Sequence, residues 1–315
     1  MVVTLHETFH CYLIASFSDP ELSLPHHSPR HSTPKLGTTP SDPIFILENE
    51  SGSAPADEVY WVQELGLKSE EKHILSTGEW LSDIHVAAAN KLLKEQYPHQ
   101  NGLQDTLALA ELCRFRSSPT DFIQIVNISR SHWVCVSNVF SSPGVVEVFD
   151  SMPAYSTTLS GLKRQVAAIL KTSEKSFDLY HVDVQRQVGG SDCCLFAIAF
   201  AASLCVRKDP HTERYAQAEM RQHLARCFEE KKITSFPNSD GRRRLGRHRI
   251  INRKKVDVFC ICRLPWDKYD GKRGPLVQCV LCKEWYHQKC LNIDQDILNQ
   301  PSAKFTCSIC LNLDC

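Results

Sequence analysis

Three runs of β-branched and aromatic residues in the middle of the chain predict three consecutive strands. They read FIQIVN from residue 122, HWVCVSN from residue 132 and VVEVFD from residue 145, and turn-forming residues separate them. Such side chains fit the pleated, half-buried surface of a sheet. We therefore expect neighbouring antiparallel strands, joined by short turns, inside a folded domain.

Apolar residues at helical spacing flank these strands. Ile84, Ala88 and Leu92 predict a helix from about residue 81 to residue 97, because every third or fourth position falls on one face. A similar pattern of Leu, Val and Ile between residues 159 and 170 predicts a second helix after the third strand.

The rest of the domain continues this alternation of elements. A strand is expected at about 177–184, an almost wholly apolar helix after Asp192, and an amphipathic helix at about 214–230. The order of helix, antiparallel strands, helix, strand and helices fits an α+β domain of roughly 170 residues.

The chain is expected to divide into four segments. Its 315 residues are more than one hydrophobic core normally fills. The first segment is rich in Ser, Pro, Thr and His, so it cannot bury enough apolar surface to offset the entropy of ordering. The expected segments are 1–56 (disordered), 57–232 (the α+β domain), 233–256 (a basic linker) and 257–315 (a second domain).

The expected linker carries eight Lys or Arg residues between Arg242 and Lys255. That density is typical of a nuclear-localisation signal or of a patch that makes weak contact with nucleic acid. It is equally typical of a solvated linker that its own charge keeps extended. The composition leaves both interpretations open.

Overall charge and cysteine use narrow the class of protein. Lys plus Arg (36) balance Asp plus Glu (36), so net charge predicts no partner. Apolar runs stay well short of the roughly 18 residues that would span a bilayer, and we expect a soluble intracellular protein without a membrane partner. Of the fifteen cysteines, about half lie after position 259, which favours metal binding over disulfides in a reducing compartment.

The spacing of these late cysteines predicts a zinc-binding domain. Eight potential ligands fall in four close pairs, and each pair can point two soft donors at one metal from a tight turn. Eight ligands suffice for two tetrahedral zinc ions. The pairs are Cys260 and Cys262, Cys279 and Cys282, His287 and Cys290, and Cys307 and Cys310.

The ligand order of four cysteines, one histidine and three cysteines, with Trp285 two residues before the histidine, resembles the PHD finger family. The resemblance implies interleaved sites: one zinc on Cys260, Cys262, His287 and Cys290, and a second on Cys279, Cys282, Cys307 and Cys310. Zinc would supply much of the folding energy of so small a domain.

PHD fingers commonly bind histone tails, above all a methylated lysine near the amino terminus of histone H3. The resemblance implies an aromatic cage, which attracts the lysine cation, at Phe259, Trp266 and Trp285. Two positions depart from the family: Leu276 stands where Met or an aromatic residue is common, and Val280 stands in place of an acidic residue. Trp285 could equally pack the zinc core.

Two adjacent cysteines, Cys193 and Cys194, follow a Gly-Gly-Ser-Asp turn and open the apolar helix. Ser191 and Asp192 are expected to accept hydrogen bonds from the first backbone N–H groups of that helix. Cys193 would then lie at the positive end of a helix dipole, which favours the thiolate. Alternatively, both thiols are small residues of the core.

A thiolate nucleophile needs a base, a group that orients the base, and donors for the oxyanion. His132 begins one predicted strand and Asp150 ends the next, so antiparallel pairing can bring them together. Gln187 lies six residues before Cys193.

The order His, Asp, Gln, Cys, with an Asp-Cys pair at a helix start, resembles the ubiquitin-like-protein proteases, the SUMO and sentrin-specific family that includes the adenovirus protease. The motifs EWLSDIH, HW, FDS and QVGGSDC extend the match over residues 58–230. The resemblance implies a papain-like fold with Cys193 as nucleophile, His132 as base, Asp150 as its orienting group and Gln187 as oxyanion donor, and no cofactor for catalysis.

The same resemblance implies a substrate channel. Trp80 and Trp133 would flank a passage that admits only Gly-Gly, and Asp83 would contact the modifier. Cys194 replaces the glycine that follows the nucleophile in the family, where a side chain could crowd the oxyanion site or sensitise the pair to oxidation.

Together the two resemblances imply a nuclear cysteine peptidase on chromatin. It would cleave after the terminal Gly-Gly of a ubiquitin-like modifier of the SUMO or NEDD8 type, and the finger would bind the histone H3 tail. Two alternatives stay open: a degenerate domain that only binds a modifier, and an acyltransferase that uses the same Cys-His-Asp site.

Overall fold

The computed structural model describes most of the chain after residue 58. The described residues are 59–106, 116–118, 120–128, 130–153, 160–239, 248–266, 273–293, 299 and 304–311. The segment 1–56, expected to be disordered, lies outside them. Within these ranges, no helix combines the length and the apolar character that crossing a bilayer requires.

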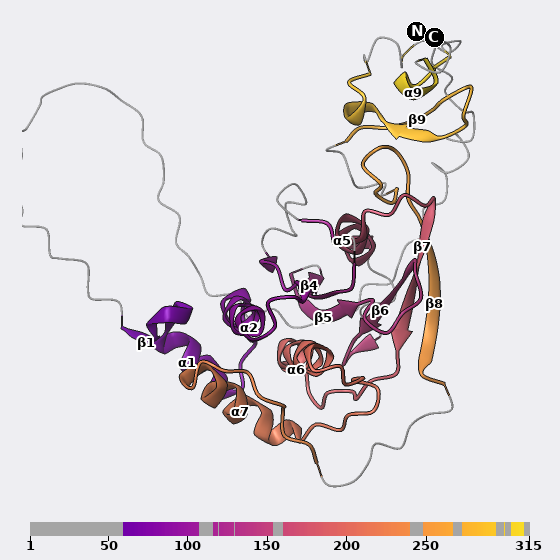
Figure 1. Ribbon diagram of the computed structural model, residues 1–315. Helices are drawn as coiled ribbons and strands as arrows, with labels where there is room; N and C mark the ends of the chain where they lie inside the picture. Colours follow the sequence, from indigo (N-terminus) through magenta and orange to yellow (C-terminus); the bar gives the residue numbers. More distant parts are fainter. Residues whose placement is uncertain are drawn as a thin grey trace, which may run out of the picture. The chain divides into compact units, whose positions relative to one another are not determined.

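A six-stranded sheet forms the centre of the first domain (Figure 1). Strands β4, β5 and β6 pair antiparallel as predicted, β6 and β7 are parallel, and β7 and β8 are antiparallel. Strand β3 adds to β4 in parallel. In sheet order the strands are β3 (Asn101–Gly102), β4 (Phe122–Ile128), β5 (His132–Ser137), β6 (Val145–Phe149), β7 (Ser176–Val182) and β8 (Ile250–Asp257).

Helices cover both faces of this sheet, so the domain is mixed α/β (Figure 1). Alternate side chains of β4 point to opposite faces: Ile125 packs with helix α6, whereas Val126 packs with helix α5. Twelve of the thirteen residues of α6 are buried, because helices α2 and α7 lie beyond it in the same apolar cluster. The four helices are α2 (Asp83–Gln96), α5 (Ser160–Leu170), α6 (Cys193–Cys205) and α7 (Gln217–Glu229).

Short elements before α2 complete this side of the domain. Strands β1 and β2 pair antiparallel, and helix α1 contacts α7. Leu67 and Leu75 carry these elements into the α6 cluster. The bounds are β1 (Tyr60–Val62), η2 (Gln63–Leu65), β2 (Leu67–Lys68) and α1 (Ser69–Thr77).

Helix α2 is rotated relative to the apolar stripe that its sequence suggests. Ala88 and Leu92 are buried as expected, but Ile84 is 41% exposed. His85 takes the buried position instead: its Nδ1 accepts from the backbone N–H of Ser82 at 3.2 Å, and its Nε2 lies 3.0 Å from the carbonyl of Glu71. A buried polar side chain thus bonds to the backbone at the start of α2.

Part of the segment expected to be a linker is strand β8. Ile250–Asp257 pairs with the whole of β7, and Val256 is buried beneath α5. Arg249, just before the strand, forms ion pairs with Glu147 of β6 and with Asp209, the latter at 2.6 Å. Three of the eight residues of this strand are basic, and only Val256 is buried. The described residues of the segment therefore include an edge strand from Ile250 onward.

The cysteine-rich domain has small elements of its own. Strand β9 pairs antiparallel with β10, with Gln278 opposite Trp285. Its core cluster combines apolar residues such as Val277 and Phe305 with four of the cysteines. The elements are β9 (Leu276–Gln278), β10 (Trp285–His287), η3 (Gln288–Cys290) and α9 (Ser308–Leu311).

Candidate active site and metal centre

His132 and Asp150 form a buried pair at one end of the sheet. Antiparallel pairing of β5 and β6 places the start of one strand beside the end of the other. His132 Nε2 lies 2.8 Å from Asp150 Oδ1, and both residues are only 3% exposed. The same carboxylate oxygen accepts from the backbone N–H of Met152 at 2.7 Å. The imidazole is therefore held through Nε2, which leaves Nδ1 for another partner.

Cys193 supplies that partner from the first turn of α6. Burial alone would lower the pKa of His132, but hydrogen bonds to Asp150 and Cys193, together with their charges, raise it to about 9. Cys193 is the first residue of α6 and so lies at the positive end of the helix dipole. The site therefore brings together a sulfur, an imidazole and a carboxylate, the three groups that a cysteine nucleophile needs.

Gln187 faces the turn that follows Asp150. Its Oε1 accepts from the hydroxyl of Ser151 at 2.7 Å, and its backbone N–H donates to the Ser151 carbonyl at 3.2 Å. Its Nε2 donates to the Gly189 carbonyl at 3.0 Å. These bonds fix which end of the amide is oxygen, and one N–H of the side chain remains for a ligand. Ser151 is part of the FDS motif, but its role was not apparent from sequence.

Asp192 does not cap α6 through its side chain, contrary to expectation. Its carboxylate is held instead by two residues of α7: Arg221 at 2.6 Å and Gln217 Nε2 at 2.6 Å. An ion pair with a forked guanidinium outweighs a neutral cap bond. The sequence did not single out Arg221 or Gln217, because in an amphipathic helix they cannot be distinguished from other polar residues on the side that faces solvent.

Cys194, next to Cys193, is buried in the core. It is 1% exposed and belongs to the apolar cluster around α6. Burial raises the pKa of its thiol well above the ordinary value, and the neighbouring Cys193 adds to the shift. Cys194 is therefore a neutral thiol, and the two adjacent cysteines differ in environment.

The three residues expected to bind the modifier lie in different environments. Trp80 is 58% exposed, just before α2, and Asp83 is the first residue of that helix. Trp133, next to His132 on β5, is only 7% exposed and packs in the α6 cluster. Trp80 is thus available to a ligand, whereas Trp133 has mainly core contacts.

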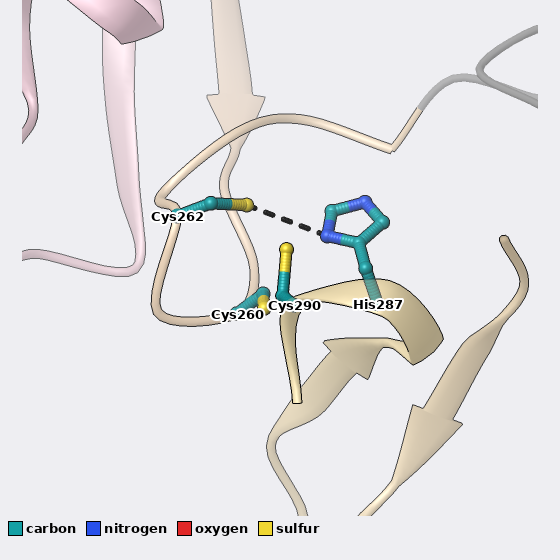
Figure 2. A group of neighbouring side chains, drawn as sticks. All are labelled: Cys260, Cys262, His287 and Cys290. Atoms are coloured by element: carbon teal, nitrogen blue, oxygen red, sulfur yellow. Dashed lines mark hydrogen bonds between the residues drawn. The ribbon is translucent and has the colours of Figure 1, made fainter. Parts of the chain in front are cut away.

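The eight expected metal ligands gather in two groups. Within each group, all ligand atoms lie within 4.8 Å of one another. Figure 2 shows the first group, with the side chains converging from the loop after β8, from β10 and from η3. The groups are Cys260, Cys262, His287 and Cys290, and Cys279, Cys282, Cys307 and Cys310, the interleaved sets that the resemblance implies.

The separations within the groups fit tetrahedral zinc. Zinc–sulfur bonds of about 2.3 Å at tetrahedral angles place two sulfurs about 3.8 Å apart. Cys279 and Cys310 have sulfurs 3.9 Å apart, and Cys262 Sγ lies 3.4 Å from His287 Nδ1 (Figure 2). Sulfurs at these distances are too far apart for disulfides. Soft donors in this arrangement suit zinc.

The three expected cage residues lie close in sequence to ligands of the first metal group. Phe259 packs against the core of the finger beside Cys260, and Trp266 is 51% exposed. Trp285 lies on β10 opposite Gln278. Residues 267–272, which follow Trp266, lie outside the described residues, so the cage stays a prediction.

Comparisons with known proteins agree with this division. Residues 256–314 match the family of UBR7-like PHD fingers. The chain is 42% identical over 74 residues to the Lid2 complex component lid2 of Schizosaccharomyces pombe, covering 24% of this chain and 4% of that protein. It is 42% identical over 41 residues to lysine-specific demethylase phf2 of Danio rerio, covering 13% of this chain and 4% of that protein. The matches thus span a few per cent of these relatives.

A solved structure of the SUMO protease Ulp1, with its catalytic cysteine oxidized to a sulfonic acid, is also similar. The match covers 56% of this chain and 91% of that chain, with 15% identity and a TM-score of 0.46. The first domain is mixed α/β, and residues 256–314, which match UBR7-like PHD fingers, contain two clusters of cysteine and histidine that fit zinc.

Proposed function

We propose that the protein is a cysteine peptidase that cleaves the peptide or isopeptide bond after the terminal Gly-Gly of a ubiquitin-like modifier. One observation carries the proposal: the buried His132–Asp150 pair lies against Cys193 at the start of α6. The sequence order of these residues, with Gln187, supports the substrate class through the resemblance to SUMO-type proteases.

In this mechanism the Cys193 thiolate attacks the carbonyl carbon of the last glycine. The carbonyl oxygen becomes an oxyanion, which accepts from the free N–H of Gln187 and from the backbone N–H of Cys193. His132 then gives its proton to the leaving amine as the carbon–nitrogen bond breaks. Water, activated by the neutral imidazole, hydrolyses the thioester and restores the thiol.

The finger would direct this activity to chromatin in the nucleus. The two clusters would each hold one zinc ion, whose role is to fix the fold of the finger. Phe259, Trp266 and Trp285 would receive a lysine of the histone H3 tail through their ring faces. A weak reader joined to the enzyme raises the local concentration of chromatin-bound substrates.

The labelling of the chain by modifier probes tests the substrate class. SUMO, NEDD8 and ubiquitin that carry a carboxyl-terminal vinyl sulfone are expected to form a thioether with Cys193, SUMO or NEDD8 faster than ubiquitin, and tandem mass spectrometry locates the bond. If a modifier binds without bonding to sulfur, the domain is a binding module. If acetyl-coenzyme A acylates Cys193 instead, the protein is an acyltransferase that uses the same site.

The pH dependence of hydrolysis tests the state of His132. Because its pKa is raised to about 9, the imidazolium that protonates the leaving amine is present below that pH and lost above it. We expect kcat/KM for a modifier–aminomethylcoumarin substrate to fall above pH about 9. Asp150→Asn removes the carboxylate that raises this pKa, so the alkaline limb should move to lower pH. If the alkaline limb of the pH profile stays at the same pH in Asp150→Asn, it does not report the ionisation of His132.

A further inference from the structure

Arg221 of α7 contacts two chain segments, one just before Cys193 and one just before Trp80, although no recognised motif contains it. Its Nε donates to Asp192 Oδ1 at 2.9 Å, in the loop before Cys193. Its Nη2 donates to the carbonyl of Glu79 at 2.8 Å, immediately before Trp80. The guanidinium is 15% exposed and its Asp192 partner 13%, so water replaces these bonds poorly.

The side chain of Gln217, one turn earlier on α7, bonds to the backbone of the same loop. Its Oε1 accepts from the N–H of Val188 at 2.8 Å, and its Nε2 donates to the carbonyl of Val188 at 2.9 Å. The same Nε2 lies 2.6 Å from Asp192 Oδ2. The loop from 188 to 192 is therefore fastened at both ends to one helix.

We propose that Arg221 and Gln217 are positioning residues that hold the two rims of the substrate channel at a fixed separation. One rim is the loop 188–192, which lies between the two proposed oxyanion donors, Gln187 and Cys193, and the other is the segment 79–83, which carries Trp80. The inference that these rims form a channel rests on the proposed function. The fastening itself rests on the contacts of α7.

A forked guanidinium suits this role better than an ammonium. Arg221 Nη2 lies 2.6 Å from Asp192 Oδ1 and 2.8 Å from the carbonyl of Glu79, while Nε adds a second bond to Asp192 and Nη1 reaches the carbonyl of Ile74 at 3.3 Å. A lysine has one nitrogen and could not reproduce all of these bonds at once. Arg221→Lys should therefore separate the charge of the residue from its geometry.

Hydrogen exchange of the full, zinc-loaded chain tests the fastening without any substrate. In Gln217→Ala, the amide of Val188 loses its acceptor and should exchange at least about tenfold faster. In Arg221→Met, amides of both 79–83 and 188–192 should accelerate. Arg221→Lys should keep most protection in 188–192 and lose it in 79–83.

Arg249→Met is the matched control, because Arg249 also forms partly buried ion pairs, with Glu147 and Asp209, at another edge of the domain. It should leave both rims within about twofold of the parent. Unchanged exchange at the rims in Arg221→Met, or acceleration spread evenly over the domain, would overturn the inference.

A kinetic comparison connects the rims to the site. Arg221→Lys should alkylate at Cys193 with iodoacetamide within about threefold of the parent, because His132 and Asp150 are intact. Its labelling by a modifier vinyl sulfone should slow by about 100-fold. Equal slowing with both reagents would mean that Arg221 acts on the thiolate rather than on the rims. If no modifier labels the parent, the proposed function fails, while the exchange data still decide the fastening.

Discussion

Cys193→Ser is expected to lower hydrolysis of a modifier–aminomethylcoumarin substrate by at least about 10⁴-fold. A serine hydroxyl stays protonated beside His132, because its pKa lies far above that of the imidazolium. The neighbouring residue provides a sharp contrast. Cys194 is buried in the core as a neutral thiol, so Cys194→Ala should keep kcat within about threefold of the parent.

The pair of variants isolates chemistry from packing, because both remove one sulfur from the same helical turn. Circular dichroism should show that both variants fold, with the lower melting temperature in Cys194→Ala, since that substitution leaves a small cavity. If Cys194→Ala loses most of its activity while its melting temperature is unchanged, the assignment of Cys193 as the nucleophile is wrong. Full activity in Cys193→Ser would end the peptidase proposal.

The same comparison addresses the glycine that the resemblance places after the nucleophile. A Cys194→Gly variant restores the family residue, at a cost of about 1 kcal/mol for glycine in a helix. Because the Cys194 side chain packs inside the α6 cluster, we expect kcat to change little. A large gain in kcat would show that the thiol crowds the oxyanion site.

The central strands and the His132–Asp150 pair could be predicted because their pattern is local. Runs of β-branched and aromatic residues identify β5 and β6, and a short turn makes them neighbours, so the start of one strand lies beside the end of the other. The apolar character of α6 likewise identifies a helix buried on all sides. These arguments need only residues close together in sequence.

Strand β8 could not be predicted in this way. Its partner β7 ends at Val182, far earlier in the chain, and three of the eight residues of β8, Arg253, Lys254 and Lys255, are basic. The density of basic residues therefore suggested a solvated linker. Val256 is the single buried residue of the strand, so the sequence shows no alternation of apolar and polar residues that would predict a strand. Edge strands often carry lysine, since charge discourages pairing with other chains.

Asp192 shows why a local rule can fail beside a functional site. The sequence Ser-Asp before a helix favours a side-chain cap, yet Asp192 bonds to Arg221, 29 residues later in the chain. Asp192 does not cap the helix; its carboxylate binds Arg221 instead, and this contact fixes the loop beside Cys193. Such a choice depends on the tertiary position of α7, and no pattern within the loop contains it.

Removal of zinc is expected to unfold the finger. Structural zinc sites contribute roughly 10–16 kcal/mol of apparent binding free energy at neutral pH. The finger core holds few apolar residues beside its cysteines, so little remains to offset the entropy of ordering. Dialysis against a chelator should abolish the dispersed NMR signals of residues 256–314, and two equivalents of zinc should restore them.

Substitution of one ligand should have the same effect as the chelator. Cys279→Ser removes a sulfur from the second cluster, whereas Cys205→Ser removes one from the core of the first domain, outside both clusters. We expect lost zinc and a disordered finger in Cys279→Ser only, measured by elemental analysis and NMR. Retention of two zinc ions in Cys279→Ser would contradict the second site.

Cadmium-113 NMR separates the interleaved pairing from a sequential one. In the interleaved arrangement, one cadmium couples to the β-protons of Cys260, Cys262 and Cys290, and the other couples to those of Cys279, Cys282, Cys307 and Cys310. A sequential arrangement would couple Cys260 and Cys279 to the same ion. The sulfur separations support the first pattern, because the Cys279–Cys310 and Cys282–Cys307 pairs of the second cluster, both 3.9 Å apart, already have the edge length of a zinc tetrahedron.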